Sequence, residues 1–406
     1  MRLTLIGYGN VGRAFARLIE RQRAAHPFSI VGIHTARHGT AYDDAGLKIE
    51  PAFGPPASSV DEFLDRAKSD IVVEITTLNP ATGEAALSHI RAAFARGRHV
   101  VTANKGPIAH AYAALRDEAK SAGVEFRFES TVMDGVPVFN SVRKNLPGVK
   151  VLGFTGVLNS TSKVVIAAMR EGKSMEDGIE AARRLGITEA DASYDIDGWD
   201  SAAKTAVLAN VLMDARVTPH DVDRRGIGRL TPERVLKLAN GRKTVCLVSR
   251  ARTTPSGIWL RVRAEVIDDT SLLASVEGTS NLLLLDTDLM GTIGIMGIAS
   301  GVEQTAYGVF SDVVDIAGTP RLGNYSGAAG FEEKRNNSRV QPSIYRRIAS
   351  SKTMAENKKC AHPACNCIAS SDSKYCSQYC DDAGDTVELA CNCGHSSCAD
   401  ELTPKR

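Results

Sequence analysis

The stretch that decides the fold is residues 2–20, RLTLIGYGNVGRAFARLIE. It begins with an apolar run typical of a buried strand and continues, after the glycines, with apolar side chains at helical spacing. Gly7, Gly9 and Gly12 form a GxGxxG pattern between these two predicted elements. There the first glycine allows a tight turn, the second lets the backbone approach a pyrophosphate, and the third lets helix and strand pack closely. The stretch therefore predicts a dinucleotide site, with a glycine-rich turn that binds no ligand as the alternative.

The type of dinucleotide depends on the end of the second predicted strand, residues 29–35. Asn10 and Val11 begin the helix whose N-terminus faces the pyrophosphate, while an NAD-selective site usually carries an acid at the end of that strand. In place of an acid this chain has Thr35, Arg37 and His38. A cation there can pair with a 2′-phosphate, so Arg37 favours NADP. The alternative is that these basic residues are only solvated loop charges, in which case NAD is possible.

Strands that alternate with amphipathic helices continue through residues 1–128 and predict a parallel sheet. Further strands are expected at residues 70–76, 98–104 and 124–130. From residue 129 to about 300 the pattern changes, and residues 243–252 and 257–267 predict an antiparallel hairpin. A last helix at residues 301–318 is expected to return to the first domain. The fold class is α/β: a Rossmann-type nucleotide-binding domain and a mixed α+β substrate-binding and dimerisation domain over residues 129–300.

Length, charge and hydropathy limit the classes of function. The 406 residues are enough for two or three domains. The net charge of +2 gives no overall field that favours nucleic acid or a membrane surface. No apolar run approaches the roughly 18 residues of a membrane span, and no signal-peptide pattern precedes the first strand. We expect a cytoplasmic protein that binds a small molecule, with no membrane and no specific nucleic acid as partner.

The composition changes at Thr319. Residues 319–353 are polar and contain glycine and serine, and from Arg321 to Lys359 nine Lys or Arg residues accompany three Glu. This segment predicts a flexible basic linker, with weak nucleic-acid contact as the alternative.

Cysteines concentrate at the end of the chain, with eight of the nine in the last 47 residues. Disulfides would suit a secreted mini-domain, but an enzyme-like cytosolic body favours metal ligation. Because CxC pairs suit bridging thiolates, ten ligands would hold about three or four tetrahedral ions. The predicted ligands are Cys360, His362, Cys365, Cys367, Cys376, Cys380, Cys391, Cys393, His395 and Cys398. Residues 354–406 resemble bacterial metallothioneins, and zinc is favoured over cadmium or copper(I).

Charged residues in two places predict an active site. Lys105 follows the strand at residues 98–104, at the edge where open α/β sheets bind ligands. Asp200 and Lys204 are four residues apart on a predicted helix and lead into an apolar stripe, which favours a cleft over a surface ion pair. A lysine there can relay a proton while the acid holds its position. Upstream, two carboxylates suit a substrate ammonium, Glu189 and Asp195.

Seven motifs occur in the order found in homoserine dehydrogenases, and residues 1 to about 318 resemble that family. The motifs are GYGNVG, HVVTANKGP, ESTVMDGVP, GVLNSTS, ITEADASYDIDGWDSAAK, LASVEGTSN and GVEQTAYGVFSDVVDIA. The family reduces L-aspartate 4-semialdehyde to L-homoserine with NAD(P)H, on the route to threonine, methionine and isoleucine. The resemblance implies this reaction and a homodimer formed through the catalytic domain.

The resemblance also implies roles for single residues. Lys105 and Lys204 would lie at the substrate carbonyl, with Lys105 also touching the cofactor and Asp200 orienting the site. The amino-acid head group would be bound by Thr161, Glu189 and Asp195. A late glycine-rich loop with Gly301 would lie near the nicotinamide. A loop for Na⁺ or K⁺, or else a plain turn, would present mainly the backbone carbonyls of Glu129, Val132, Asp134 and Val136.

Two departures from the family leave the substrate open. The family often reads NGTTNY where residues 159–164 read NSTSKV, so that Ser160 and Lys163 replace Gly and Asn. In the late loop, Ile298 and Ser300 replace commoner small residues. One alternative is therefore a dehydrogenase for a related semialdehyde. Another is a metal storage or resistance protein whose oxidoreductase body has drifted, although the retained lysines and Asp200 argue against it.

Overall fold

The computed structural model describes residues 1–188 and 191–318, together with Cys360. The chain divides into two compact units, residues 1–324 and 325–406, and the elements below belong to the first. Three expectations lie outside the described residues: the substrate contact of Glu189, the linker at 319–353 and the metal-ligand set of the tail beyond Cys360. Within the described residues, no helix is both long enough and apolar enough to cross a membrane.

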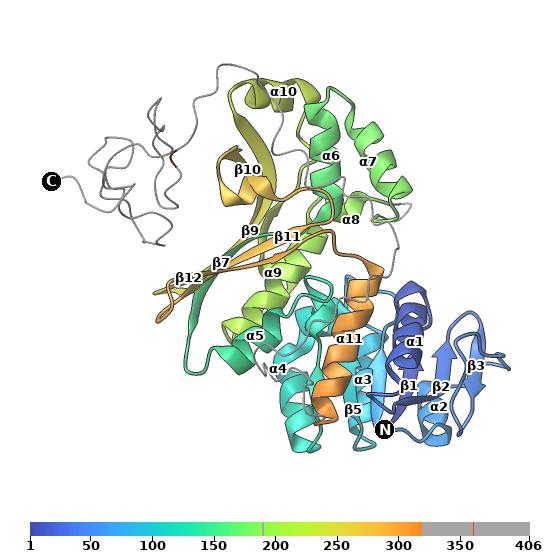
Figure 1. The fold of residues 1–406 in the computed structure, drawn as a ribbon. Coiled ribbons are helices and arrows are strands. Elements are labelled where there is room, and N and C mark those ends of the chain that lie inside the picture. The colour runs from blue at the N-terminus through green and yellow to red at the C-terminus, as the bar shows by residue number, and fades with distance from the viewer. Residues whose placement is uncertain (189–190, 319–359, 361–406) are drawn as a thin grey trace. The chain divides into compact units, whose positions relative to one another are not determined.

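A six-stranded sheet organises the first half of the chain (Figure 1). Its order is β3-β2-β1-β4-β5-β6, and all neighbours are parallel apart from the antiparallel β2–β3 pair. The strands are β1 (Arg2–Ile6), β2 (Ser29–Thr35), β3 (Gly39–Tyr42), β4 (Ile71–Glu74), β5 (His99–Thr102) and β6 (Phe126–Arg127). The chain order reverses between β1 and β4, which is where open α/β sheets bind ligands. The predicted Rossmann-type sheet is confirmed.

Helices cover both faces of this sheet because successive strand side chains point to opposite sides. Leu3 and Leu5 pack in a core with α1 and α11, whereas Ile6 packs in the core on the other face with α2, α3 and α4. The bounds are α1 (Asn10–Gln22), α2 (Val60–Arg66), α3 (Ala86–Phe94), α4 (Lys105–Ser121) and α11 (Val302–Ile316). The last helix, α11, lies against α1, as predicted (Figure 1).

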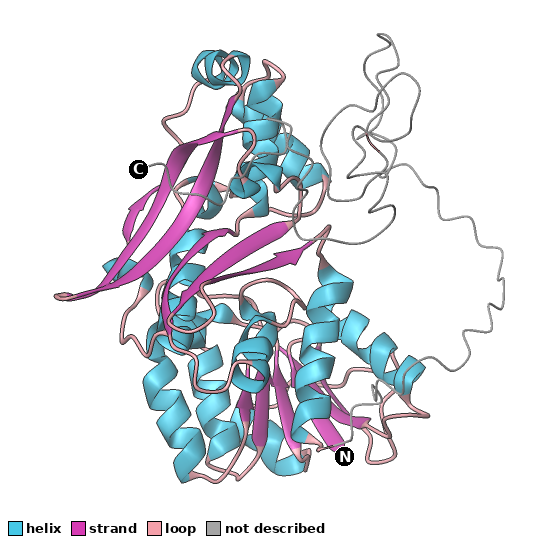
Figure 2. Ribbon diagram, turned by 60° about the vertical axis from the view of Figure 1, so that its left-hand side comes forward, coloured by secondary structure: helices cyan, strands magenta, loops and turns pink. Residues whose placement is uncertain are grey.

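A second six-stranded sheet, of order β12-β11-β7-β9-β10-β8, organises the other half. Its strands are β7 (Val151–Val157), β8 (Asp223–Arg225), β9 (Lys243–Thr254), β10 (Gly257–Asp268), β11 (Asn281–Thr287) and β12 (Thr292–Gly297). Its helices are α5 (Val138–Asn145), α6 (Ser160–Arg170), α7 (Met175–Arg184), α8 (Ser193–Ile196), α9 (Trp199–Leu212) and α10 (Pro232–Asn240). Helices α6, α9 and α10 contact β9, so they cover one side of the sheet (Figure 2).

The structure confirms one strand prediction in this region and corrects another. The predicted hairpin is present: β9 and β10 pair antiparallel, from Thr254 opposite Gly257 to Lys243 opposite Asp268. The predicted strand at residues 124–130 is wrong beyond Arg127, because residues Glu129–Thr131 form a 3₁₀ helix, η1. The backbone N–H of Glu129 donates to Asp312 Oδ2 at 2.8 Å, so a side chain of α11 takes the place of a neighbouring strand.

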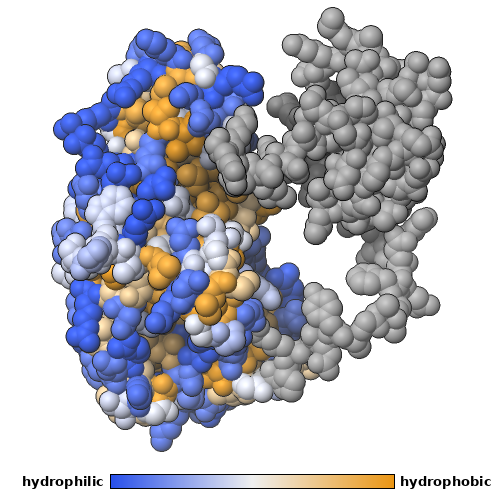
Figure 3. Space-filling view, turned by 90° about the vertical axis from the view of Figure 1, so that its left-hand side faces the viewer, coloured by the Kyte–Doolittle hydropathy of each residue, from blue (hydrophilic) through white to orange (hydrophobic). Residues whose placement is uncertain are grey.

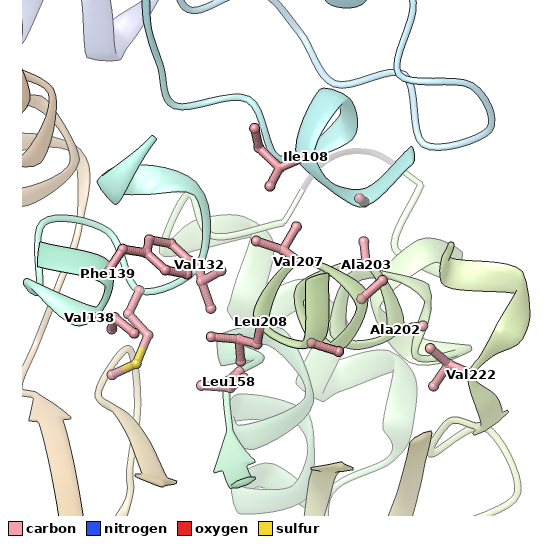
Figure 4. Close-up of a cluster of buried hydrophobic side chains, with 14 of the residues drawn as sticks. Ile108, Val132, Val138, Phe139, Leu158, Ala202, Ala203, Val207, Leu208 and Val222 are labelled. Atoms are coloured by element: carbon pink, nitrogen blue, oxygen red, sulfur yellow. The ribbon is translucent and has the colours of Figure 1, made fainter. Parts of the chain in front are cut away.

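One buried apolar cluster joins the two halves of this unit (Figure 4). In it Val207 of α9 lies toward Ile108 of α4, and Leu208 lies toward Leu158 at the end of β7. Helix α9 therefore packs on the nucleotide-binding half and on the second sheet at once. Because α9 also carries Asp200 and Lys204, this shared core determines where both side chains lie relative to the first residue of α4, Lys105.

Candidate active site

The glycine turn after β1 fits a dinucleotide. Gly7 has φ of +100°, and a Cβ at this position would lie 2.5 Å from the carbonyl oxygen of Ile75, so only glycine is accommodated. A Cβ on Gly9 would meet nothing within 4 Å, which leaves open space where a phosphate would approach. Helix α1 begins at Asn10 without a side-chain cap, so its first N–H groups are available to an anion. These features fit the pyrophosphate of NAD(P).

A cavity of about 510 Å³ opens at this turn. Its lining includes Gly7, Gly9, Arg37 and His38, with both of these basic side chains on an exposed turn, and no carboxylate is among the described residues that line it. Thr35 stabilises the turn itself, because its hydroxyl accepts a hydrogen bond from the N–H of His38 and donates to the Gly39 carbonyl. Because Thr35 is used within the turn, Arg37 is the side chain at the cavity that can offer a positive charge to a ligand.

The structure brings three charged residues from the two halves together. Lys105 Nζ lies 3.0 Å from Asp200 Oδ1, and Lys204 Nζ lies 3.1 Å from Asp200 Oδ2. Lys204 also donates to the carbonyl oxygen of Leu158 at 2.7 Å. Lys105 begins α4 directly after Asn104, whose side chain caps that helix at the carboxyl end of β5. One carboxylate thus bridges two ammonium groups, one from each half of the unit.

A cavity of about 250 Å³ lies beside this group, lined by Lys204, Asp200 and Asp195 among others. Asp195 Oδ2 accepts hydrogen bonds from the hydroxyls of Thr161 at 2.9 Å and Thr188 at 3.1 Å. The amide Nδ2 of Asn159 donates to Asp195 Oδ1 at 2.6 Å and to Asp200 Oδ2 at 3.0 Å. Asp195 is therefore held in place by neutral donors, whereas Asp200 is held by two lysines and one amide, and both carboxylates face a small polar space.

Electrostatics in this cavity follow from burial and close charge pairs. Burial alone would raise the pKa of Asp200, but the charges of Lys105 and Lys204 outweigh it and hold that pKa well below its usual range. Burial likewise opposes the charge of Lys204, yet the neighbouring carboxylates outweigh it and raise its pKa. The pKa of Asp195 is raised, first by burial and then by the charge of Asp200. Lys204 is thus protonated at neutral pH and can donate a proton.

The remaining predicted site residues fall in several places. Gly301 lines the 250 Å³ cavity together with Asp134, while Val11 lies on the first turn of α1. In the predicted cation loop, the Glu129 carboxylate accepts hydrogen bonds from the N–H groups of Phe139 and Asn140. Val132 is buried, and the carbonyl of Val136 accepts from the N–H of Val138. Among the residues described, no group of three or more His, Cys, Asp or Glu side chains is arranged to hold a metal ion.

Several cavity residues were not singled out from the sequence. Asn159 links two carboxylates and Thr188 holds one of them, while Asn281 and Thr279 also line the cavity. A signal existed for Asn159, because asparagine is a preferred residue at the start of a helix, and its side chain caps α6. Asn281 gave no such signal, since it reaches the cavity from a strand more than a hundred residues further along the chain.

Comparison with known proteins identifies both halves. Residues 7–129 match the family model of the homoserine dehydrogenase NAD-binding domain, and residues 137–314 match that of homoserine dehydrogenase. The homoserine dehydrogenase of Methanocaldococcus jannaschii is 35% identical, over 78% of this chain and 98% of its own length. The NAD(+)-dependent homoserine dehydrogenase of Pseudomonas canavaninivorans is 33% identical, over 78% of this chain and 96% of its own.

Solved structures agree with this assignment. Homoserine dehydrogenase from Thermoplasma acidophilum superposes with a TM-score of 0.69 at 25% identity, covering 78% of this chain and 99% of that one. A hyperthermophilic archaeal homoserine dehydrogenase in complex with NADPH gives 0.67 at 28% identity, with 78% and 97% covered. The fold and the site define an NAD(P)-dependent oxidoreductase. The chain belongs to the homoserine dehydrogenase family.

Proposed function

We propose that this chain interconverts L-aspartate 4-semialdehyde and L-homoserine, with NADP as its preferred cofactor and Lys105, Asp200 and Lys204 as its catalytic residues. The observation that carries the proposal is the lysine–aspartate–lysine bridge, with distances of 3.0 and 3.1 Å, at the wall of a small polar cavity. The test is consumption of NADPH by the purified protein with aspartate semialdehyde as substrate. If the protein turns over a related semialdehyde but not aspartate semialdehyde, the result would favour the alternative, a dehydrogenase for that related substrate.

The proposed mechanism assigns the proton to Lys204. An ammonium has three N–H donors; two of them are used by Leu158 and Asp200, so the third is free for the substrate carbonyl oxygen. A bound nicotinamide supplies the hydride to the carbonyl carbon. As charge develops on the oxygen, Lys204 donates its proton, and Asp200 keeps both lysines charged and in position. The substrate ammonium would be held by Asp195, with Thr161 beside it and Glu189 as a further carboxylate.

The NADP preference is supported by the exposed Arg37 at the nucleotide cavity and by the lack of a carboxylate among the described residues lining it. Arg37→Ala is expected to raise KM for NADPH more than KM for NADH, because the guanidinium would pair only with a 2′-phosphate. The two KM values are measured under identical conditions. Equal effects on both cofactors would contradict the role.

We further propose that residues 129–136 bind Na⁺ or K⁺, mainly through the backbone carbonyls of Glu129, Val132, Asp134 and Val136. The support is the resemblance of the ESTVMDGV segment to such a loop, and the adjacency of Asp134 to the substrate cavity. Activity measured in Tris buffer with and without added KCl or NaCl, at constant ionic strength, tests this. Activity that is independent of both cations would contradict it.

A homodimer through the second sheet is proposed as well. Helices cover one side of this sheet, whereas Leu152 on β7, Trp259 on β10 and Met296 on β12 are exposed. Figure 3 shows one face of the molecule, on which hydrophobic residues lie next to hydrophilic ones. Apolar side chains that a monomer leaves exposed together mark interaction surfaces. Sedimentation of the wild type and of Met296→Glu tests the dimer: the variant is expected to shift toward the monomer.

For the tail we propose a separate function, binding of zinc or another soft metal by the cysteines and histidines of residues 354–406. The support is the sequence alone: ten ligands with CxC pairs, in a pattern that resembles bacterial metallothioneins. Elemental analysis of the purified full-length protein tests it. A protein that carries no metal after expression in zinc-supplemented medium would contradict it.

A further inference from the structure

Lys163 is a buried cation for which the proposed mechanism has no use. It lies in the second turn of α6 and is only 8% exposed. Its Nζ donates a hydrogen bond to Asn281 Oδ1 at 3.3 Å, and no carboxylate of the described residues lies within ion-pair distance of it. The charged and titratable groups that act on it are Lys204, Asp200, Cys246 and Asp134. Burying an ammonium group without an ion-pair partner is energetically costly, so Lys163 is a candidate for a functional role.

The ammonium decides the orientation of the Asn281 amide. A protonated lysine has donors and no acceptor, so the amide presents Oδ1 to it and directs Nδ2 elsewhere. Nδ2 donates one long hydrogen bond, of 3.4 Å, to the carbonyl of Thr279. An amide nitrogen has two N–H groups, so a second donor remains. Because both Asn281 and Thr279 line the 250 Å³ cavity, this donor is available to a molecule bound there.

The polar groups that line the cavity can be matched to the parts of an α-amino-acid substrate. Asp195, held by Thr161 and Thr188, suits the ammonium. Lys204 has a donor for the carbonyl oxygen. The wall with Asn281, Thr279 and Ser300 is left for the carboxylate, and among these lining residues none is charged. Behind that wall lies Lys163, which donates a hydrogen bond to Asn281 and brings positive charge to this side of the cavity.

We propose that Lys163 is a positioning residue that acts through Asn281: it aims the amide Nδ2 at the carboxylate of the substrate and adds a positive potential behind it. The inference rests on the proposed function, since it concerns the same cavity and an amino-acid substrate. It assigns the recognition of the carboxylate to a pair formed by α6 and the first residue of β11, rather than to a surface arginine or lysine.

The central test is Lys163→Met, which removes the charge and the donor while keeping the length of the side chain. KM for L-homoserine is expected to rise about tenfold, the range of one hydrogen bond to a charged group, while kcat changes less than about threefold. Wild-type turnover of homoserine is measured alongside and decides the proposed function independently. Lys173→Met, at an exposed lysine paired with Glu171, is the matched control and is expected to behave as wild type.

Two inhibitors separate carboxylate recognition from general damage. L-2-Aminobutyrate has both charged groups of the substrate, whereas in L-2-aminobutyramide the carboxylate is a neutral amide. Lys163→Met is expected to raise the inhibition constant of the first about tenfold and that of the second by less than about twofold. Equal changes for the two inhibitors, or no change for either, would overturn the inference.

Two further variants address the route through Asn281. Lys163→Gln keeps a donor to Oδ1 without the charge and is expected to recover part of the affinity for aminobutyrate. Asn281→Leu is expected to lose as much affinity as Lys163→Met, and the double variant no more than either. Additive losses would contradict an action through Asn281. Urea unfolding of each variant checks the fold, and Lys163→Met is expected to be at least as stable as the wild type because it removes a buried charge.

Discussion

Asp200 illustrates how much chemistry one side chain organises in this protein. Its two oxygens serve two lysines from different halves of the fold, and an asparagine amide shares one of them. Of the two lysines, only Lys204 also lines the cavity. The proposed mechanism therefore assigns protonation of the substrate oxygen to Lys204, while Lys105 balances the charge of the carboxylate from the side of the nucleotide-binding sheet.

Replacement of Lys204 by alanine tests this division at the level of turnover. Lys204→Ala is expected to reduce kcat with aspartate semialdehyde by at least about a hundredfold, because general acid catalysis contributes roughly 10²–10⁴. The measurement is initial-rate NADPH oxidation at saturating cofactor. Near-wild-type turnover would remove Lys204 from the catalytic group. Lys237→Ala, on the unrelated helix α10, is the control and is expected to leave kcat unchanged.

A second prediction concerns Lys163 and the way in which the free energy of unfolding depends on pH. Burial, reinforced by Lys204, lowers its pKa to about 7, below the value of about 10.4 that an unfolded chain has. The folded protein therefore holds this proton less tightly than the unfolded chain does. The cost of the buried charge is full below pH 7 and falls as the pH rises above it.

Lys163→Met removes that cost. The variant is expected to have a free energy of unfolding higher than the wild type by about 1–4 kcal/mol at pH 6, with a smaller difference at pH 9. Urea unfolding at the two pH values measures it. A difference that grows with pH would show that the folded protein holds this proton more tightly than the unfolded chain does, so that the pKa of Lys163 is not lowered.

At the scale of elements, the turn between β1 and α1 offers a matched pair of substitutions. Gly7→Ala brings a Cβ to 2.5 Å from the Ile75 carbonyl oxygen at a φ of +100°, so it is expected to cost about 1–3 kcal/mol of stability and to abolish NADPH binding. Gly9→Ala meets nothing within 4 Å and is expected to leave stability unchanged while weakening NADPH binding. Urea unfolding and NADPH fluorescence titration measure both, and equal stability losses would refute the distinction.

The elements also show how far sequence reasoning reaches. Periodicity and glycine spacing predicted β1, α1, the β9–β10 hairpin and the return of α11, because these follow from local patterns. They failed at Glu129, where a side chain from α11 replaces a strand partner. In the same way Lys105 and Asp200 were each predictable, but their 3.0 Å contact depends on the packing of α9 on α4. The Lys163–Asn281 pair spans 118 residues, a separation that no local pattern records.

For the whole molecule, the question is whether the tail takes part in catalysis. The Lys105–Asp200–Lys204 group and both cavities are built from residues of the first compact unit. Deletion of residues 354–406 is therefore expected to leave kcat and KM of the dehydrogenase unchanged while removing bound metal. NADPH oxidation and elemental analysis of the two proteins measure this. A collapse of activity in the shortened protein would make the tail part of the enzyme.

The return of α11 has a consequence for how the protein is made. The core of the nucleotide-binding sheet takes Leu3 and Phe15 from the start of the chain and Val309, Phe310 and Val313 from α11. A nascent chain that ends before residue 302 exposes the apolar face of α1 to water and to chaperones, because the helix that covers it has not been translated. The half of the enzyme that is synthesised first is therefore completed last, after the second sheet has left the ribosome. Translational pausing before α11 would prolong that exposure, whereas a pause after α11 has left the ribosome would not.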